Sequence, residues 1–223
     1  MPVVSVSDDV VPDTVAALRA GAPVVLPLPS PLAYTVTATD ATVVNTAKGR
    51  PAGQSVGLSV ADLNVIAPFL DVAEEVLPLV RWLCDAELVS VLAPVLAGAP
   101  AWLEPAVSKG SVFFTATPWV PELGGVIAEL TYVYMSSANV TATAPAVTAA
   151  QAAEAFGDGV LVLDGDRARD LSTPHGSTAM VRVTADGELS VARSGINNAA
   201  FGEDLAGYAT DLSRRWRAAA GRG

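Results

Sequence analysis

The stretch YVYMSSAN, residues 132–139, shows the pattern on which the fold prediction depends. Four apolar or aromatic residues are followed at once by hydroxyl and amide side chains, which is typical of a buried strand that ends in a polar loop. Three other polar clusters also fall at strand ends or in loops. Because α/β folds place ligand sites at such strand ends, these clusters are candidates for a ligand site.

Outward from this stretch, strand-like and helix-like patterns alternate for most of the chain and then give way to antiparallel strands. This order predicts an α/β protein with a mixed sheet covered by helices, in one domain. The predicted strands are residues 23–28, 34–39, 56–60, 87–93, 111–115, 132–135, 160–163, 179–183 and 189–192. The predicted helices are residues 14–20, 41–47, 61–69, 72–84, 118–129, 148–156 and 204–219.

The composition limits the classes of partner. The 223 residues carry a formal net charge of −10, and an acidic surface repels phosphate backbones, so direct nucleic-acid binding is disfavoured. The mean hydropathy of +0.43 is high. However, the longest apolar stretch, residues 88–103, is broken by Pro94 and Pro100 and is too short to span a membrane. Asp8 and Asp9 stand where a signal peptide would be apolar, so we expect a cytoplasmic protein.

Counting arguments exclude several kinds of site. A single cysteine, Cys84, excludes an internal disulfide and a multi-thiolate metal site, and we expect it to pack in the core. The single histidine, His175, excludes zinc sites built on a pair of histidines. Residues 164–170 contain three aspartates without the spacing of a calcium loop, so we expect a solvated turn. The sequence therefore predicts no metal bound by protein ligands alone, and the common nucleophile-elbow, Walker and dinucleotide motifs are absent.

The four polar clusters hold the residues that bear chemistry. Lys48 and Arg50 flank a glycine in KGRP, and such a pair of cations can neutralise a triphosphate. The hydroxyls and amide of residues 136–139 can hold a carboxylate, an amine or a ribose. Residues 175–178, HGST, are a candidate nest for an anion, and Arg193 closes the last strand. Taken alone, each cluster is more typical of an ordinary polar turn.

Taken in order, the clusters resemble the YrdC-like family. KGRP at residues 48–51 matches the Lys-x-Arg-Pro motif, SAN at 137–139 the Ser-x-Asn motif, STA at 177–179 the Ser-Thr-Val motif and RSG at 193–195 the Arg-x-Gly motif. PSPLAYT at residues 29–35 falls at the family's first conserved segment. The resemblance extends over residues 10–196, nearly the whole chain.

The resemblance implies a fold and an activity. The family fold is a twisted mixed (parallel and antiparallel) sheet with flanking helices around a deep concave site, so residues 1–200 would be a single YrdC-like domain and residues 201–223 a C-terminal helical extension. Well-studied members are threonylcarbamoyl-AMP synthases, which combine L-threonine, bicarbonate and ATP, release pyrophosphate and feed a tRNA adenosine modification. The implied partners are therefore small molecules, with Mg²⁺ accompanying the ATP.

The resemblance also implies roles for single residues. Lys48 and Arg50 would clamp the phosphates and stabilise the charge that develops on the leaving pyrophosphate. The nucleotide-binding residues would be Ser137, Asn139, Ser177 and Arg193. The substrate-binding residues would be Ser30, Tyr34, Ser136 and Thr178.

This sequence also departs from the family at positions that matter for chemistry. The first segment has lost both threonines and its acid, and Leu32 stands there instead. Phe113 stands where the family carries an arginine, so one cation of the phosphate clamp is missing. Three interpretations follow: an adenylate-forming enzyme with another amino-acid or acyl partner, the housekeeping threonine enzyme, or a catalytically degenerate module that binds a nucleotide or metabolite. A more apolar pocket would favour a less polar partner than threonine.

Overall fold

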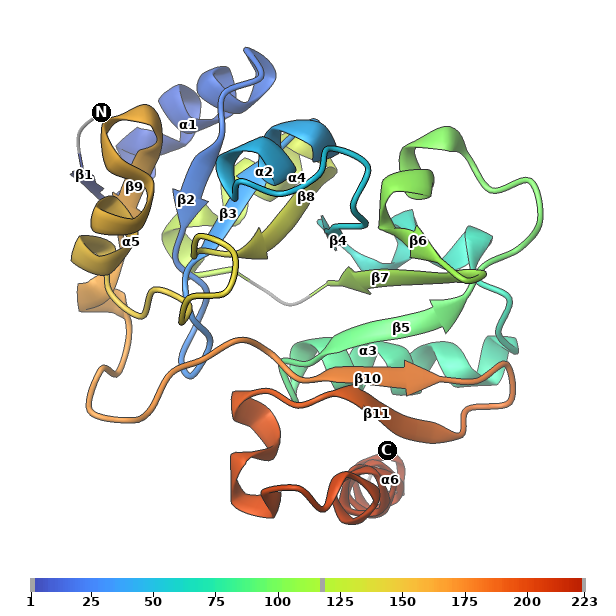
Figure 1. Ribbon diagram of the computed structural model, residues 1–223. Coiled ribbons are helices and arrows are strands. Elements are labelled where there is room, and N and C mark those ends of the chain that lie inside the picture. Colours follow the sequence, from blue (N-terminus) through green and yellow to red (C-terminus); the bar gives the residue numbers. More distant parts are fainter. Residues whose placement is uncertain (1–2, 117–118, 222–223) are drawn as a thin grey trace.

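The computed structural model describes residues 3–116 and 119–221 and arranges them as one open sheet flanked by helices (Figure 1). The strand order is β1-β9-β2-β3-β8-β4-β7-β5-β10-β11, and the short β6 pairs with β7. The strands are β1 Val3–Ser5, β2 Val24–Leu26, β3 Thr35–Ala38, β4 Gly57–Val60, β5 Ser90–Pro94, β6 Val107–Ser108, β7 Ser111–Thr115, β8 Tyr132–Ser137, β9 Leu161–Asp164, β10 Met180–Val183 and β11 Leu189–Arg193. The helices are α1 Val11–Arg19, α2 Ala41–Ala47, α3 Leu77–Asp85, α4 Gly124–Leu130, α5 Ala149–Phe156 and α6 Leu205–Ala220.

The sheet is mixed, which confirms the predicted fold class. Strands β1 and β9, β9 and β2, β4 and β7, and β5 and β10 pair in parallel. Strands β2 and β3, β3 and β8, β8 and β4, β7 and β5, and β10 and β11 pair in an antiparallel manner. The first six residues of the stretch YVYMSSAN form β8, Tyr132–Ser137, which lies near the centre of the sheet between β3 and β4.

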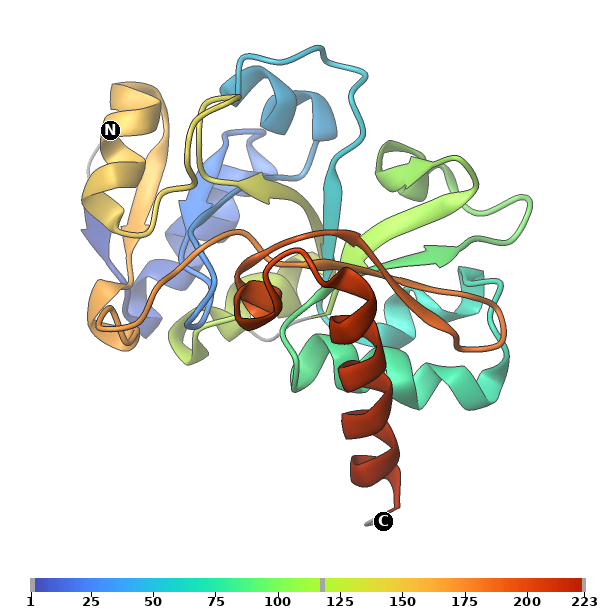
Figure 2. The ribbon, with the colours of Figure 1, turned by 60° about the horizontal axis from the view of Figure 1, so that its bottom comes forward.

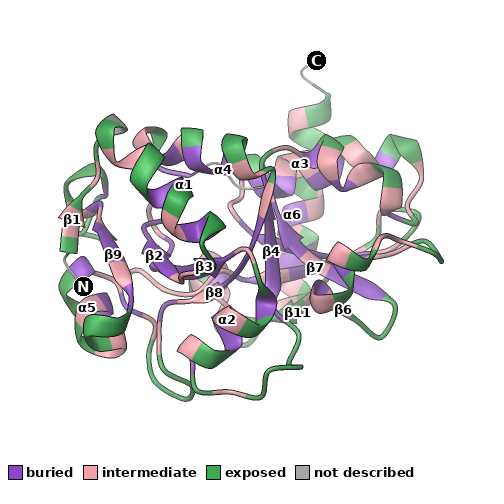
Figure 3. Cartoon of the chain, turned by 90° about the horizontal axis from the view of Figure 1, so that it is seen from above, coloured by how far each residue is buried: buried purple, intermediate pink, exposed green. Residues whose placement is uncertain are grey.

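Buried apolar side chains lie on both faces of the sheet. On β2, Val24 and Leu26 belong to one buried group and Val25 to the other, as expected because successive side chains of a strand point to opposite faces. Figure 3 shows buried residues along the strands and exposed residues on the outer sides of the helices. Cys84 is fully buried, and burial raises the pKa of its thiol to about 12, which fits the packing role predicted for it. Among the described helices, none combines the length and apolar character needed to cross a membrane.

Two predicted helices are wrong in extent. Residues 61–69 form two 3-10 turns, Leu63–Val65 and Ala67–Phe69, instead of one helix. The helix predicted over residues 72–84 begins only at Leu77, after a 3-10 turn over Glu74–Val76. Pro78 lies in the first turn of α3 and does not interrupt it, because the N–H that proline lacks has no partner there in any helix.

Other predictions differ mainly at their boundaries. The helix predicted over residues 118–129 is a 3-10 turn, Pro121–Leu123, followed by α4, and residue 118 lies outside the described residues. Strands β1 and β6 were not predicted because runs of three and two residues are too short for a periodic signal. The predicted bounds of α2 and β7 are confirmed, as is the cap of α5, where Thr148 Oγ1 accepts a hydrogen bond from the backbone N–H of Gln151.

Helix α6 packs on the domain. Its Tyr208 and Leu212 are buried in the same core as the central strands. The ring of Trp216 lies 5.8 Å from that of Trp82 on α3, and Arg215 forms an ion pair with Glu87. Figure 2 shows α6 lying beneath the sheet, with its C-terminal end extending past the rest of the domain.

The packing of α6 predicts that Leu212→Ala destabilises the whole domain. Leu212 is completely buried, and removing such a side chain typically costs about 2–5 kcal/mol of the free energy of unfolding. Leu171→Ala is the matched control, because Leu171 is 42% exposed and its loss should change stability by less than about 0.5 kcal/mol. Urea denaturation of the two variants measures the difference, and equal stabilities would show that α6 does not contribute to the core.

Candidate functional site

Hydrogen bonds between backbone groups bring four of the five sequence motifs together. Ala138 donates to the carbonyl of Tyr34, and Ala33 donates to that of Gly176. Ile196 donates to the carbonyl of Ser177, which joins the last two motifs. Segments far apart in the sequence therefore meet across the middle of the sheet.

An apolar pocket lies where these segments meet. Its walls come from the segment that enters β3, the ends of β7, β8 and β11, the beginnings of β4 and β5, and the loop that leads into β10. The lining residues are Leu28, Leu32, Ala33, Tyr34, Thr35, Gly57, Leu58, Ser90, Phe113, Phe114, Thr115, Met135, Ser136, Ser137, Gly176, Ser177, Thr178 and Arg193. Apolar side chains form most of the wall, and several hydroxyl groups supply its polar contacts.

Phe113 separates this apolar pocket from a second pocket. Its ring lies over Gly57, where an added Cβ would be 2.9 Å from Phe113 Cε1, so only glycine leaves room for the ring. The guanidinium of Arg193 lies 5.8 Å from the centre of the same ring, within cation–π range. Phe113, Gly57, Ser136 and Arg193 line both pockets, which therefore adjoin each other.

The second pocket, here called the cationic pocket, is lined by Arg50, Lys109, Arg182 and Arg193 and by no Asp or Glu. The chain has 13 Lys and Arg residues against 23 Asp and Glu residues, so four cations without an acid are an unusual local composition. Over residues 3–116 and 119–221, none of the four takes part in an ion pair. An uncompensated group of cations favours an anionic ligand.

Arg50 has a guanidinium group that is only partly satisfied. Its Nε donates to Oδ1 of Asn45, and Asn45 Nδ2 in turn donates to the carbonyls of Ala52 and Gln54, both at 2.7 Å. The Nη2 atom of Arg50 is buried and has no hydrogen-bond partner within the described residues. Burial also lowers the pKa of Arg50. Because an unpaired buried donor is costly, this atom is suited to a ligand oxygen.

Lys48 is buried at the end of α2, and its ammonium group is held by protein oxygen atoms. Nζ donates to the carbonyl of Ser137 at 2.5 Å, to that of Asn139 at 2.8 Å and to Asn139 Oδ1 at 2.7 Å. These contacts use all three donors of an ammonium group. Burial lowers the pKa of Lys48 to about 7, and repulsion by Arg50 and Arg193 acts in the same direction.

The side chain of Asn139 is committed to the turn after β8. Besides Lys48, its Oδ1 accepts from Ser137 Oγ at 2.7 Å, and its Nδ2 donates to the carbonyl of Thr143 at 2.7 Å. Asn139 lines neither pocket. Its side chain therefore positions the turn and does not face either pocket.

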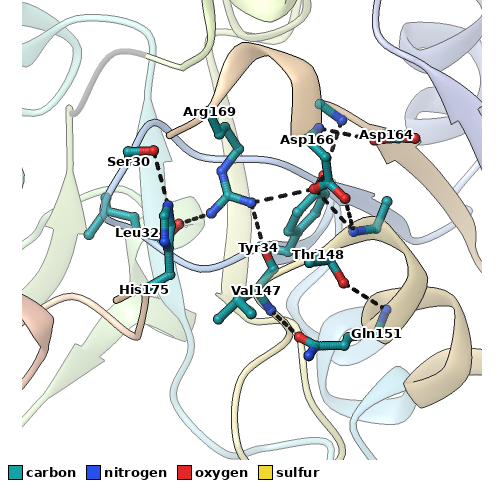
Figure 4. Close-up of polar contacts among 12 residues, drawn as sticks. Ser30, Leu32, Tyr34, Val147, Thr148, Gln151, Asp164, Asp166, Arg169 and His175 are labelled. Atoms are coloured by element: carbon teal, nitrogen blue, oxygen red, sulfur yellow. Dashed lines mark hydrogen bonds and ion pairs between the residues drawn. The ribbon is translucent and has the colours of Figure 1, made fainter. Parts of the chain in front are cut away.

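A buried network ties the first motif to the start of α5 (Figure 4). Tyr34 donates its hydroxyl to Asp166 Oδ1 at 2.6 Å, and the same carboxylate accepts from the backbone N–H of Ala149. Arg169, whose side chain is 0% exposed, donates to the carbonyls of Leu32 and Val147 and lies over the Tyr34 ring. The solvated turn expected over residues 164–170 is therefore wrong for Asp166, which is bonded inside the domain. Burial, together with the hydrogen bond to Asp166, raises the pKa of Tyr34.

Ser30 and His175 form a second tie, between two loops (Figure 4). His175 Nδ1 donates to the carbonyl of Thr173 at 2.8 Å, because a carbonyl can only accept. The Nε2 atom therefore accepts from Ser30 Oγ at 3.0 Å, and this oxygen also accepts from the N–H of Asp170. Ser30 does not line the apolar pocket.

The residues that the structure describes do not form a binding site for a resident divalent cation. The described residues contain no group of three or more His, Cys, Asp or Glu side chains with suitable geometry. Both pockets also lack a carboxylate in their walls. A magnesium ion would have to be bound mainly by phosphate oxygens of a nucleotide.

Comparison with known proteins identifies the family of the chain. A family model named for Sua5, YciO and YrdC and described as telomere recombination matches residues 16–195. This chain belongs to the Sua5/YciO/YrdC family. No curated protein matches it.

Solved structures of other proteins share the fold of this family member. P. abyssi Sua5 complexed with L-threonine has 16% identity and a TM-score of 0.67, and the match covers 91% of this chain and 62% of that one. E. coli YciO has 13% identity and a TM-score of 0.64, with 85% and 91% covered. A full-length HypF in a phosphate- and nucleotide-bound form has 17% identity and a TM-score of 0.63, with 85% and 29% covered. The chain thus spans about three fifths of the Sua5 length.

The structure brings most of the predicted site residues of this family member together, but only some of them line a pocket. The pocket walls include Tyr34, Arg50, Ser136, Ser137, Ser177, Thr178 and Arg193, whereas Ser30, Lys48 and Asn139 lie behind them. The hydroxyl of Thr178 is engaged by the carbonyl of Leu88 at 3.0 Å. Sequence reasoning missed Lys109 and Arg182. Lys109 could have been noticed, because it is one of only two lysines and no Asp or Glu occurs between Glu104 and Glu122. Arg182 gave no such signal, because it lies in an ordinary strand pattern.

The lowered pKa of Lys48 predicts a specific pH dependence of stability. Between about pH 7 and pH 10 the unfolded chain binds a proton at this lysine and the folded chain does not, so the free energy of unfolding gains a contribution that rises with pH. Chemical denaturation at several pH values should show this rise in the wild type relative to Lys48→Met. Lys109→Met, which replaces the exposed lysine, should follow the wild type. Parallel curves for the wild type and Lys48→Met would contradict the burial of a lysine with this pKa.

Proposed function

We propose that this protein is an adenylate-forming enzyme that transfers the adenylyl group of ATP to a carbamoylated amino acid and releases pyrophosphate. The observation that carries the proposal is the cationic pocket, which adjoins a small pocket with apolar walls and hydroxyl groups. A polyphosphate matches the cationic pocket, and an amino acid matches the apolar pocket. The fold is shared with a Sua5 solved with L-threonine and a HypF solved with phosphate and nucleotide, which supports ligands of these two classes.

The arrangement of the pockets fits the displacement that such a reaction needs. A carboxylate oxygen of the carbamate attacks the α-phosphorus, the bond from this phosphorus to the bridging oxygen breaks, and the electron pair leaves with pyrophosphate. Attacking and leaving oxygens lie roughly in line in such displacements. The two pockets adjoin at Phe113 and Arg193, so an α-phosphate beside Arg193 would have the acceptor on one side and the leaving group on the other.

In this proposal the residues act mainly by position and charge. Arg50 offers the unpartnered Nη2 to a phosphate oxygen, and Arg193 lies where both pockets meet. The resemblance implies that Lys48 binds the phosphates directly, but its three donors are bonded to Ser137 and Asn139. It contributes positive charge behind the pocket wall, and an anion beside Arg50 and Arg193 would raise its pKa by removing their repulsion.

A second candidate function is a nucleotide-binding module without turnover. Two points favour it: the resemblance implies an arginine where this sequence has Phe113, and the ammonium of Lys48 is fully engaged by protein oxygens. In the enzyme interpretation with threonine as substrate, the product would feed the tRNA modification known for the family. Measurement of turnover separates these functions.

The first test follows pyrophosphate release from MgATP in the presence of bicarbonate and an amino acid, with products identified by mass spectrometry. The proposal expects pyrophosphate and an adenylate from the wild type. Arg50→Gln should lower kcat/KM for ATP at least tenfold, which corresponds to about 1.4 kcal/mol. Arg167→Gln is the control because Arg167 is exposed and lines neither pocket. ATP binding without pyrophosphate release would favour the non-catalytic module, and absence of ATP binding would exclude both functions.

A second prediction concerns the amino acid. Leu28, Leu32, Phe113 and Met135 make the acceptor pocket apolar, so L-valine should be accepted at least as well as L-threonine, with which it is nearly isosteric. Where apolar side chains surround the side chain of the amino acid, a pocket cannot discriminate strongly between threonine and the nearly isosteric valine. Pyrophosphate release with each amino acid at equal concentration gives the ratio of kcat/KM. A preference for threonine of a hundredfold or more would contradict an apolar acceptor pocket.

A further inference from the structure

We propose that Arg182 and Lys109 bind the β- and γ-phosphates of the nucleotide, in place of the arginine that the family carries at the position of Phe113. The proposal rests on the proposed function and assigns two binding residues that neither the motifs nor the resemblance indicate. Both side chains line the cationic pocket together with Arg50 and Arg193.

The register of the sheet places Arg182 on the same side as Phe113. Arg182 on β10 is paired with Leu92 on β5, and Leu92 is paired with Phe113 on β7. Directly paired residues of adjacent strands point to the same face, and two strand spacings amount to about 9.5 Å. Arg182 is therefore the cation that reaches the pocket wall from the strand two places away from Phe113.

Lys109 reaches the pocket from the turn that joins β6 to β7. This turn leads directly into β7, the strand that carries Phe113. The backbone of Lys109 in this turn has a φ of 51°. This left-handed conformation disfavours residues other than Gly, Asn and Asp. A lysine therefore occupies a backbone position better suited to glycine, and its side chain lines the cationic pocket.

Among the described residues, neither cation has an acidic partner that would explain its position structurally. Arg182 Nη1 donates to Ser111 Oγ at 3.3 Å, which leaves the other donors of the guanidinium free of described partners. Lys109 has no ion pair over residues 3–116 and 119–221. By contrast, Arg19, Arg81, Arg169, Arg214 and Arg215 are all paired with carboxylates. Repulsion among unpaired cations in one pocket is relieved by a ligand of high negative charge.

The terminal phosphates are the ligand group that fits this pocket best. They carry most of the negative charge of a nucleoside triphosphate, and a guanidinium fork with a lysine point charge recognises phosphate oxygens well. A nucleic-acid backbone is disfavoured because the chain as a whole has a net charge of −10. The leaving pyrophosphate would thus be bound on the side of Phe113 that faces away from the apolar pocket.

The test measures binding of MgATP, inorganic pyrophosphate and AMP by calorimetry to the wild type and to the double variant Arg182→Gln/Lys109→Gln. We expect the double variant to lose at least tenfold in affinity for MgATP and pyrophosphate and less than twofold for AMP, which lacks the β- and γ-phosphates. Arg167→Gln is the matched control and should retain wild-type affinities. Thermal unfolding of each variant checks that the fold is retained.

The outcomes separate this inference from the proposed function. If the wild type binds MgATP and the double variant binds MgATP and pyrophosphate equally well, the inference is wrong and the proposed function stands. An equal loss of affinity for AMP would also overturn it, because the two cations would then act on the nucleoside monophosphate. A wild type that binds neither MgATP nor pyrophosphate would overturn the proposed function itself.

Discussion

The site depends on one buried ammonium group. Lys48 ends helix α2, and its three hydrogen bonds fix the backbone of Ser137 and Asn139 at the end of β8. This contact joins two segments 89 residues or more apart, and the strand that it fixes pairs with both β3 and β4. Because the group is removed from water and lies near two arginines, its charge is costly, and the surrounding oxygens offset part of that cost.

The protein concentrates positive charge in one place although its total charge is negative. Elsewhere, five arginines are paired with carboxylates, so their fields are largely cancelled. The residues around the cationic pocket lack such partners, and the surrounding low-dielectric walls strengthen their field at short range. The acidic outer surface would repel large polyanions, whereas a small one that enters the pocket would meet four cations.

Much of the fold and part of the site could be predicted from the sequence, because both leave local signals. Apolar runs that end in polar clusters predicted the central strands, and the order of the clusters pointed to Arg50, Ser177 and Arg193 as candidates, which the structure places in pocket walls. Arg182 could not be found this way, because its place beside Phe113 depends on the pairing of β10 with β5 and of β5 with β7. Asn139 lies in a family motif and Ser30 in the divergent first segment, and both use their polar atoms within the protein, so their binding roles stay predictions. Residues 61–69 failed as a helix because a composition that suits a helix also suits short turns with a proline at their start.

Helix α6 also protects one side of the sheet. Strand β11 is the last in the strand order and pairs only with β10 among the described strands, so its other edge has unpaired backbone groups. Helix α6 packs against this strand and buries Tyr208 and Leu212 beneath it. A fragment that ended before Leu205 would expose an apolar surface next to an open strand edge, a combination that promotes edge-to-edge association between copies. The C-terminal helix therefore keeps this apolar surface beside the strand edge covered, in addition to its part in the core.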